Sequence, residues 1–188
     1  MIKTETLAVF CIVLALIVFP CLAMILTGIA TPFIEGFAVD ASDRLYVGVQ
    51  EEIRVYDNGE LAYVISPQTS KGYAFTITED DQILLSTSSI TYRMSLSGDI
   101  LEKNEEDSVS LYNELNWGKK QFVSASGDEY RMKSYLGWTR IIKNGEERVY
   151  RISVLSFAVK CLLAACMIAI LAFPMCVALH NSRKQKRA

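Results

Sequence analysis

"FAVDASDRLYVGVQEEIRVYDNGEL", residues 37–61, contains the clearest structural pattern in the chain. Apolar and polar residues alternate in short runs, and Asp, Asn and Gly separate the runs. A period of two is typical of β-strands, and Asp-Asn-Gly is a strong signal for a tight hairpin turn. The stretch therefore predicts strands at 37–39, 45–49, 53–56 and 61–65.

The same phrase returns twice along the chain. "FTITEDDQILLSTSSITYRMSLSGDIL" begins at Phe75, and a third, more divergent version begins at Phe122. Each version has the material for four short strands with Asp- or Gly-containing turns between them. We expect β units at about 36–66, 73–103 and 121–152.

The sequence between the second and third units has a different pattern. In "EEDSVSLYNELNWGKK", residues 105–120, Val109, Tyr112 and Leu115 recur near helical spacing, and Gly118 is a suitable helix end. One short helix is therefore expected as an insertion. It explains why the third unit follows the second at a longer interval than the second follows the first.

A repeat of about 40 residues with four strands is the pattern of a propeller blade. "VDASDRLYVGVQEEIRVYDNGEL" resembles blades of the NHL/PQQ-like propeller type, in which an Asp-containing turn precedes an apolar strand and a second strand ends in Asp-x-x-Gly-x-Leu. The resemblance covers roughly residues 36–152. It implies propeller-like antiparallel units, and it implies no particular activity.

Three units are fewer than the four to eight blades that close a propeller. Three arrangements stay open: one continuous meander or small curved sheet, a composite propeller closed between molecules, or a partial propeller completed by a partner. Because an open edge strand promotes association, we expect the edge to be covered by the membrane, by the helix near Leu111 or by a second chain.

Two uncharged segments flank this region. "LAVFCIVLALIVFPCLAMILTGIA", residues 7–30, and "CLLAACMIAILAFPMCVAL", residues 161–179, are each long enough to cross a bilayer as a helix. The second span starts at Val154 if Lys160 extends its amine to the interface, giving residues 154–179. The overall prediction is a membrane-anchored all-β protein, with its β domain at residues 31–153 between two transmembrane helices.

The first span also resembles a signal peptide, with a small-residue site at residues 28–30. Its apolar run is longer than the 7–15 residues usual for a signal peptide, so an uncleaved anchor is favoured.

The basic tail at residues 180–188 predicts the orientation. Basic residues beside a span mark the cytoplasmic side, so we expect cytoplasmic termini, including the short segment 1–6, and an extracytoplasmic β domain in the cell membrane. Four basic residues on the domain side of the second span oppose this rule, and an inverted protein with a cytosolic domain is the alternative: Arg140, Lys143, Arg148 and Arg151. The short chain and basic tail are typical of bacterial membrane proteins.

Composition excludes several functions for the β domain. Residues 31–153 carry 13 Lys or Arg and 20 Asp or Glu, a formal charge of −7, which argues against a nucleic-acid partner. This stretch has no His and no Cys, so His-dependent triads, Cys nucleophiles and ordinary zinc sites are excluded. We expect no catalytic residues, no metal and no cofactor.

Two sets of residues are candidates for contacts. Aromatic residues on or beside strands either pack the sheets or form a patch for a partner, and four are candidate partner contacts: Tyr73, Tyr92, Tyr135 and Trp138. Small residues on the second span form a helix-packing ridge, for the first span, a homo-oligomer or another membrane protein: Cys161, Ala165, Ala169, Ala172 and Cys176.

The leading functional hypothesis is a non-enzymatic interaction or sensing module that contacts a partner protein at the membrane surface. The alternative is a self-assembling structural membrane protein whose β units complete a composite sheet or propeller. The expected partners are the lipid bilayer and either another membrane protein or further copies of the chain. An enzyme that uses carboxylates or hydroxyls is the least favoured hypothesis.

Overall fold

The structure is a computed structural model that describes residues 4–27, 29–31, 33–67, 69, 72–105, 108–118, 120–135 and 138–185. The chain divides into two compact units. One is helical and contains Met1–Pro32 with Ser153–Ala188, and the other is the β domain, Phe33–Ile152.

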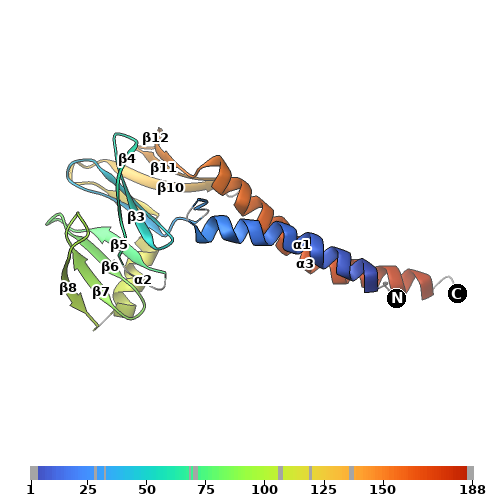
Figure 1. The fold of residues 1–188 in the computed structure, drawn as a ribbon. Coiled ribbons are helices and arrows are strands. Elements are labelled where there is room, and N and C mark those ends of the chain that lie inside the picture. The colour runs from blue at the N-terminus through green and yellow to red at the C-terminus, as the bar shows by residue number, and fades with distance from the viewer. Residues whose placement is uncertain are drawn as a thin grey trace. The chain divides into compact units, whose positions relative to one another are not determined.

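The helical unit contains two long apolar helices, α1 (Thr4–Leu26) and α3 (Val154–Gln185), shown in Figure 1. Val9–Leu26 and Val154–Phe173 are long and apolar enough to cross a membrane by length and composition. Most of their large apolar side chains are exposed, as is expected of helices that face lipid. The prediction of two apolar helices of spanning length is therefore confirmed, and α1 ends before the predicted limit at residue 30.

The two helices pack on one another inside this unit. The rings of Phe10 and Phe173 are stacked, with centroids 4.2 Å apart. Nearer the β domain in sequence, Cys21, Ala30 and Val159 form a small buried cluster.

Ser153 caps the start of α3. Its hydroxyl accepts a hydrogen bond from the Ser156 amide at 3.1 Å, and the Ser156 hydroxyl accepts one from the Thr31 amide at 2.9 Å. A serine N-cap satisfies an amide that the helix itself leaves without a partner.

Within the described residues, the strands of the β domain form three four-stranded antiparallel sheets (Figure 1). Sheet 1 contains β1 (Gly36–Val39), β2 (Leu45–Val49), β3 (Glu52–Asp57) and β4 (Glu60–Ile65). Sheet 2 contains β5 (Ala74–Ile77), β6 (Ile83–Ser86), β7 (Thr91–Met94) and β8 (Ile100–Asn104). Sheet 3 contains β9 (Gln121–Val123), β10 (Glu129–Tyr135), β11 (Trp138–Lys143) and β12 (Glu147–Arg151).

Each repeat unit is thus a sheet of its own, and the continuous meander that the sequence left open is not what forms. In every sheet the strands follow chain order, so each strand pairs with its neighbours in sequence. The Asn-Gly turns at 58–59 and 144–145 have positive φ at both residues, as the predicted hairpins require.

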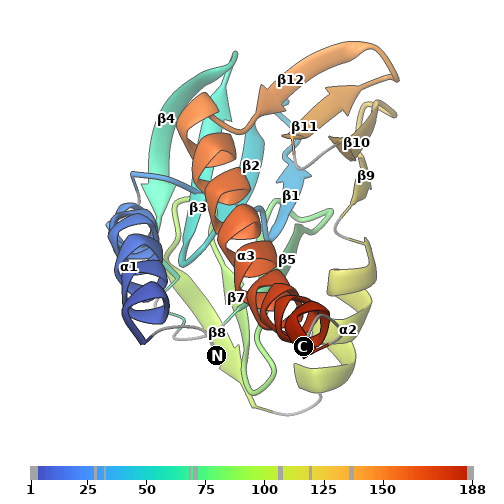
Figure 2. The ribbon, with the colours of Figure 1, turned by 90° about the vertical axis from the view of Figure 1, so that its right-hand side faces the viewer.

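Sheet 1 packs between the other two sheets. Its first strand, β1, contacts both β5 and β9 (Figure 2). Alternate side chains of β2 pack on the two faces of sheet 1. Tyr46 belongs to a core shared with sheet 2, whereas Val47 and Val49 belong to a core shared with sheet 3. Successive side chains of β2 point to opposite faces of sheet 1. Every residue of β2 is nevertheless buried, because both faces are covered by another sheet.

The predicted insertion forms helix α2 (Ser108–Gly118), which packs on β5 and β6. The fully buried Ser86 hydroxyl donates to the Ser108 carbonyl at 2.9 Å. Helix α2 therefore covers the part of sheet 2 formed by β5 and β6.

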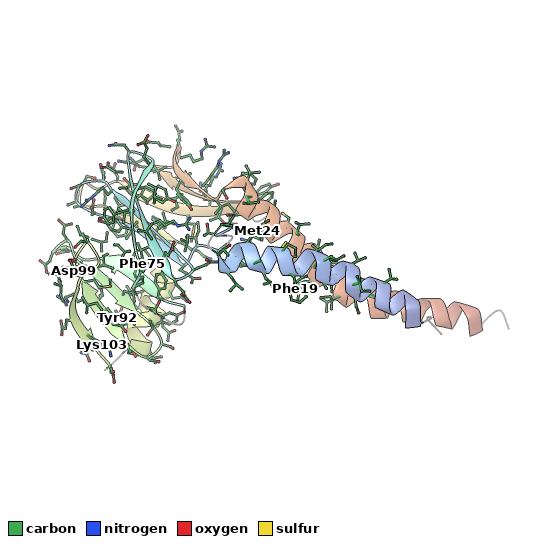
Figure 3. All side chains as sticks on the ribbon, in the orientation of Figure 1. Phe19, Met24, Phe75, Tyr92, Asp99 and Lys103 are labelled. Carbon is green, nitrogen blue, oxygen red and sulfur yellow. The ribbon has the colours of Figure 1, made fainter. Side chains whose placement is uncertain are left out.

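The β domain has two ends, defined by the strand directions. The chain enters at Gly36 and leaves at Arg151 on the same end, which we call the linker end. The turns between the first and second strands and between the third and fourth strands lie at the opposite end, which we call the turn end. In Figure 3, Asp99 marks the turn end of β8, and Lys103 lies towards the other end of that strand.

Candidate functional site

The first turn of each sheet has the same hydrogen bonding. These turns are residues 40–44, 78–82 and 124–128, and the turn at 95–99 repeats the pattern. In each, the amide of the fifth residue donates to the side-chain oxygen of the first, over 2.9, 3.3, 3.2 and 3.0 Å respectively. The fourth residue has a positive φ in every case, and Asp and Gly tolerate this conformation: Asp43, Asp81, Gly98 and Gly127. The turn end is therefore built from one repeated turn geometry.

Neighbouring turns also contact one another. The Ala41 amide donates to Asp81 Oδ1 at 3.4 Å, which joins the first turns of sheets 1 and 2. The Tyr130 hydroxyl donates to Asp43 Oδ1 at 3.4 Å, which joins sheet 3 to the first turn of sheet 1. These bonds bring the turns of three separate sheets onto one surface.

Asp40 organises the first turn of sheet 1 from a buried position. Its carboxylate accepts hydrogen bonds from the Arg44 side chain at 2.7 Å, the amides of Ser42 and Arg44 at 2.9 Å, and the Tyr46 hydroxyl at 3.2 Å. Tyr46 is fully buried, and this burial raises the pKa of its phenol well above the ordinary value, so it stays neutral. The Tyr46 oxygen also lies 3.2 Å from the Tyr63 oxygen, and Tyr63 donates to the Leu96 carbonyl of sheet 2. Asp40 is thus a structural carboxylate.

Lys143 is the centre of a second polar cluster. Its ammonium lies 2.8 Å from Asp128 Oδ2, 3.6 Å from Asp43 Oδ2 and 5.4 Å from the centroid of the Tyr130 ring. The hydrogen bonds from Lys143, then from Asn144 and Ser126, lower the pKa of Asp128 to about 2. The same ion pair raises the pKa of Lys143 above its ordinary value. Both groups stay charged across the physiological pH range.

A cleft opens beside Lys143 at the turn end, between sheets 1 and 3. Its volume is about 350 Å³. Its polar lining includes Asp43, Lys143 and Glu147, and Tyr56 is one of its aromatic lining residues. The ring of Tyr56 meets that of Tyr150 edge to face at 5.3 Å, which fixes it against sheet 3. The cleft offers two carboxylates and one ammonium to a ligand group.

The turn end as a whole is acidic. The six turn segments hold eleven Asp or Glu and two Lys or Arg: residues 40–44, 57–60, 78–82, 95–99, 124–128 and 143–147. More than half of the acidic residues of the β domain are therefore gathered here. Loops held by a rigid sheet scaffold are the usual place for binding residues.

Two of the predicted contact aromatics belong to or pack against the core shared by sheets 1 and 2. Tyr73 is 1% exposed, and its hydroxyl donates to the Glu52 carbonyl at 2.6 Å. It is a core residue that joins sheets 1 and 2, and a partner has no access to it in this structure. Tyr92 is half-buried and packs on the same core (Figure 3).

The other two lie on the surface of sheet 3. Tyr135 is 77% exposed, and Trp138 is half-buried with the Arg151 guanidinium 5.8 Å from its ring centroid. They are directly opposite one another on β10 and β11. Contact of these two residues with a partner stays a prediction.

The predicted helix-packing ridge is divided in the structure. Cys161 and Ala165 are exposed, Ala169 and Ala172 are half-buried, and the side chain of Cys176 lies outside the described part of α3. Among the described side chains of α3, the buried ones are Ser156, Val159 and Cys166. The exposed half of the ridge thus lies beside the face that meets α1, and its contact with another helix stays a prediction.

The cleft residues were not among the candidates from sequence. Asp43, Lys143 and Glu147 are far apart in the chain, and each has an ordinary role in a turn. One sequence signal could have identified them. Corresponding turns of repeated units lie at the same end of the domain. Lys143, which precedes an Asn-Gly turn, is therefore expected near the first Asp-containing turn of another unit. Among the described residues, no group of three His, Cys, Asp or Glu side chains is placed to hold a metal ion.

Comparison with known proteins adds little to this geometry. No protein-family model matches the sequence, and no curated protein matches it. A solved structure described as that of a protein of unknown function from Bacteroides caccae is 10% identical, with a TM-score of 0.31 over 64% of this chain. The match covers 45% of that protein, less than half of its length. A similarity this low supports no inference about fold or function.

Proposed function

We propose that the protein is a membrane-anchored, non-enzymatic interaction module whose β domain binds a partner protein at the membrane surface. The observation that carries the proposal is the cleft at the turn end, lined by Asp43, Lys143 and Glu147. It lies on the end of the domain opposite to the one from which the chain continues into the helices.

The three sheets are proposed to be three blades of an incomplete propeller. Support comes from burial in sheets 1 and 2, where the first strands β1 and β5 are mostly buried and the last strand β8 is exposed throughout; in sheet 3 the first strand β9 is mostly exposed. The first strands β1, β5 and β9 are the ones that meet between sheets, as the innermost strands of blades do. Such an arrangement gives a rigid base for the turns.

The proposed anchor consists of both apolar helices. The stacking of Phe10 on Phe173 and the buried contact of Cys21 with Val159 support an uncleaved first span, because these contacts require α1 to remain with α3. The basic tail supports cytoplasmic termini and an extracytoplasmic β domain.

The chemistry of the turn end favours a basic partner surface. The Asp43 and Glu147 carboxylates outnumber the Lys143 ammonium in the cleft wall, and the surrounding turns are rich in Asp and Glu. A partner Lys or Arg side chain that enters beside Tyr56 meets an aromatic ring and two carboxylates, which suit a cation. The proposed partner therefore carries an exposed basic segment.

Site-specific photo-crosslinking in cells tests the proposal. A photoreactive residue is placed at Glu147, in the cleft, and in a matched variant at Glu102, an exposed position on β8. The proposal predicts a crosslink from position 147 to a different polypeptide, and its absence from position 102. Equal crosslinking from both positions, or from neither, contradicts it.

The alternative, a self-assembling structural protein, rests on the outer strands. β8 is exposed along its whole length, pairs on one side among the described strands, and carries the exposed Ile100 and Leu101. Exposed edge strands promote association between chains. A crosslink from position 102 to a second copy of the same chain would favour this alternative.

A further inference from the structure

The outer face of sheet 3, which points away from sheet 1, is basic. The cross-strand pairs Lys133 with Arg140, and Arg140 with Arg151, place these three side chains on one face of the sheet. The pairs of Ile142 with Arg131 and with Arg148 add two more. All five basic residues are exposed, and we call this surface the basic face: Arg131, Lys133, Arg140, Arg148 and Arg151.

This face has the opposite charge to the rest of the β domain. Residues 33–105 contain five Lys or Arg and thirteen Asp or Glu, whereas residues 120–152 contain seven Lys or Arg and four Asp or Glu. On the basic face itself Glu129 is the acidic side chain. It lies at the turn end and pairs with Arg131 at 3.0 Å. The positive charge therefore concentrates towards the linker end.

The two exposed aromatic candidates lie on the same face. Tyr135 and Trp138 form a cross-strand pair at the linker end of β10 and β11. The Arg151 guanidinium lies over the Trp138 ring at 5.8 Å from its centroid. Tyr and Trp beside basic residues are the composition found where proteins meet the membrane–water interface.

The length of the connection to α3 limits how far this cluster lies from the bilayer. Arg151 ends β12, and Val154 begins α3. Three residues span at most about 11 Å. The headgroup layer of a bilayer is about 5–8 Å thick on each side. If α3 enters the hydrocarbon at its first turn, Arg151 lies within or just above the headgroups.

We propose that the basic face docks on the bilayer surface, where its Lys and Arg side chains bind the phosphates of anionic lipid headgroups and Tyr135 and Trp138 enter the headgroup layer. The positive charge of the basic face, its Tyr and Trp side chains, and the short connection from Arg151 to α3 all favour an anionic bilayer surface as the partner of this face. The inference rests on the proposed anchoring of α3 in a membrane, and it holds for either orientation of the chain. It explains why basic residues flank the second span on the domain side, where the charge rule for topology does not expect them.

The test uses the full-length protein in nanodiscs. Trp117 is replaced by Phe, so that Trp138 is the single tryptophan. Its quenching by aqueous acrylamide and by lipids brominated near the headgroup is compared between zwitterionic nanodiscs and nanodiscs that contain phosphatidylglycerol. We expect Trp138 to be protected from acrylamide and quenched by brominated lipid in the anionic discs, with protection lost at high salt.

A charge variant and a matched control show whether the charge of the basic face causes the protection of Trp138. Lys133→Gln with Arg140→Gln removes two charges from the face and leaves Arg151 over Trp138. Each basic residue at an anionic surface contributes about fivefold to binding, so the ratio of docked to undocked domain should fall about 25-fold. Arg93→Gln with Lys103→Gln removes the same charge from sheet 2 and should leave the quenching unchanged. Thermal unfolding measured by circular dichroism shows whether each variant is folded.

Three results overturn the inference. The first is that Trp138 is not protected in anionic discs. The second is that the control substitutions reduce protection as much as the substitutions of Lys133 and Arg140. The third is that the substitutions of Lys133 and Arg140 release a co-purified polypeptide while Trp138 stays accessible to acrylamide. The last result assigns the basic face to an acidic protein. Photo-crosslinking from Glu147 does not depend on this face, so the proposed function and the lipid contact can fail separately.

Discussion

The Lys143 ammonium lies 2.8 Å from the Asp128 carboxylate, and this ion pair joins the two turns of sheet 3 at the edge of the cleft. Asn144 donates to the same carboxylate at 2.8 Å, and Ser126 donates at 3.0 Å. One half-buried carboxylate therefore holds the first turn of the sheet against its Asn-Gly turn. The wall of the proposed partner site depends on this contact.

The first prediction concerns the pH dependence of this pair. The pKa of Asp128 is lowered from 3.8 to about 2 in the folded protein, so its contribution to stability is present above pH 4 and is lost as the pH falls towards 2. Asp128→Asn should therefore unfold at a lower temperature than the wild type at pH 6. The two proteins should converge near pH 2, as measured by circular dichroism in detergent. A difference that stays constant between pH 6 and pH 2 would contradict this assignment.

The second prediction concerns the packing of sheet 1 on sheet 2. A Cβ atom at Gly48 would lie 2.8 Å from the Phe75 ring and 3.0 Å from the Tyr73 hydroxyl oxygen. Because both side chains are buried, they have little room to move, and Gly48→Ala should cost about 1–3 kcal/mol of unfolding free energy. Gly72→Ala is the matched control, since a Cβ there meets nothing within 4 Å. Equal unfolding temperatures for the two variants would show that the sheets do not pack in this way.

The third prediction concerns the buried carboxylate of the first turn. Asp40→Ala leaves the Arg44 side chain and two turn amides without their acceptor, so it should destabilise the domain by about 1–3 kcal/mol. Asp57→Ala removes an exposed turn carboxylate and should change stability by less than about 0.5 kcal/mol. Urea unfolding followed by near-UV circular dichroism compares the two. If Asp57→Ala lowers the unfolding free energy as much as Asp40→Ala does, the burial of the Asp40 carboxylate is not the cause of the destabilisation.

The fourth prediction concerns orientation. All five cysteines lie in the two apolar segments, so a cysteine introduced in the β domain gives a specific label. Glu60→Cys should react with a membrane-impermeant maleimide in intact cells, because Glu60 is exposed and the domain is proposed to be extracytoplasmic. Ser182→Cys, in the basic tail, should react only after permeabilisation. The reverse pattern would establish the inverted protein.

The strands of the β domain could be predicted from sequence because the signals are local. Alternating residues and the turns at Asp57-Asn58-Gly59 and Asn144-Gly145 give four strands per unit, and the structure has them. The spacing of Val109, Tyr112 and Leu115 likewise gave the short helix.

The assembly of the units depends on contacts that no local pattern contains. Sheet 1 lies between sheets 2 and 3, so every residue of β2 is buried. The alternation of apolar and polar residues in the sequence suggests instead that one face of the sheet is exposed to solvent. Tyr73 is buried because Gly48, 25 positions earlier in the chain, leaves room for its ring. The Lys143 cluster joins residues 100 positions apart, Asp43 and Lys143, each of which has an ordinary role in its own turn.

Gentle purification shows whether the protein is an interaction module for a different polypeptide, because a bound partner stays with it. The full-length chain is extracted in mild detergent, its molar mass is measured by light scattering, and its components are identified by mass spectrometry. We expect a second polypeptide at fixed stoichiometry, which is lost when Asp43→Asn and Glu147→Gln are combined in the cleft. A homo-oligomer or a lone monomer, with no second polypeptide bound, would contradict it.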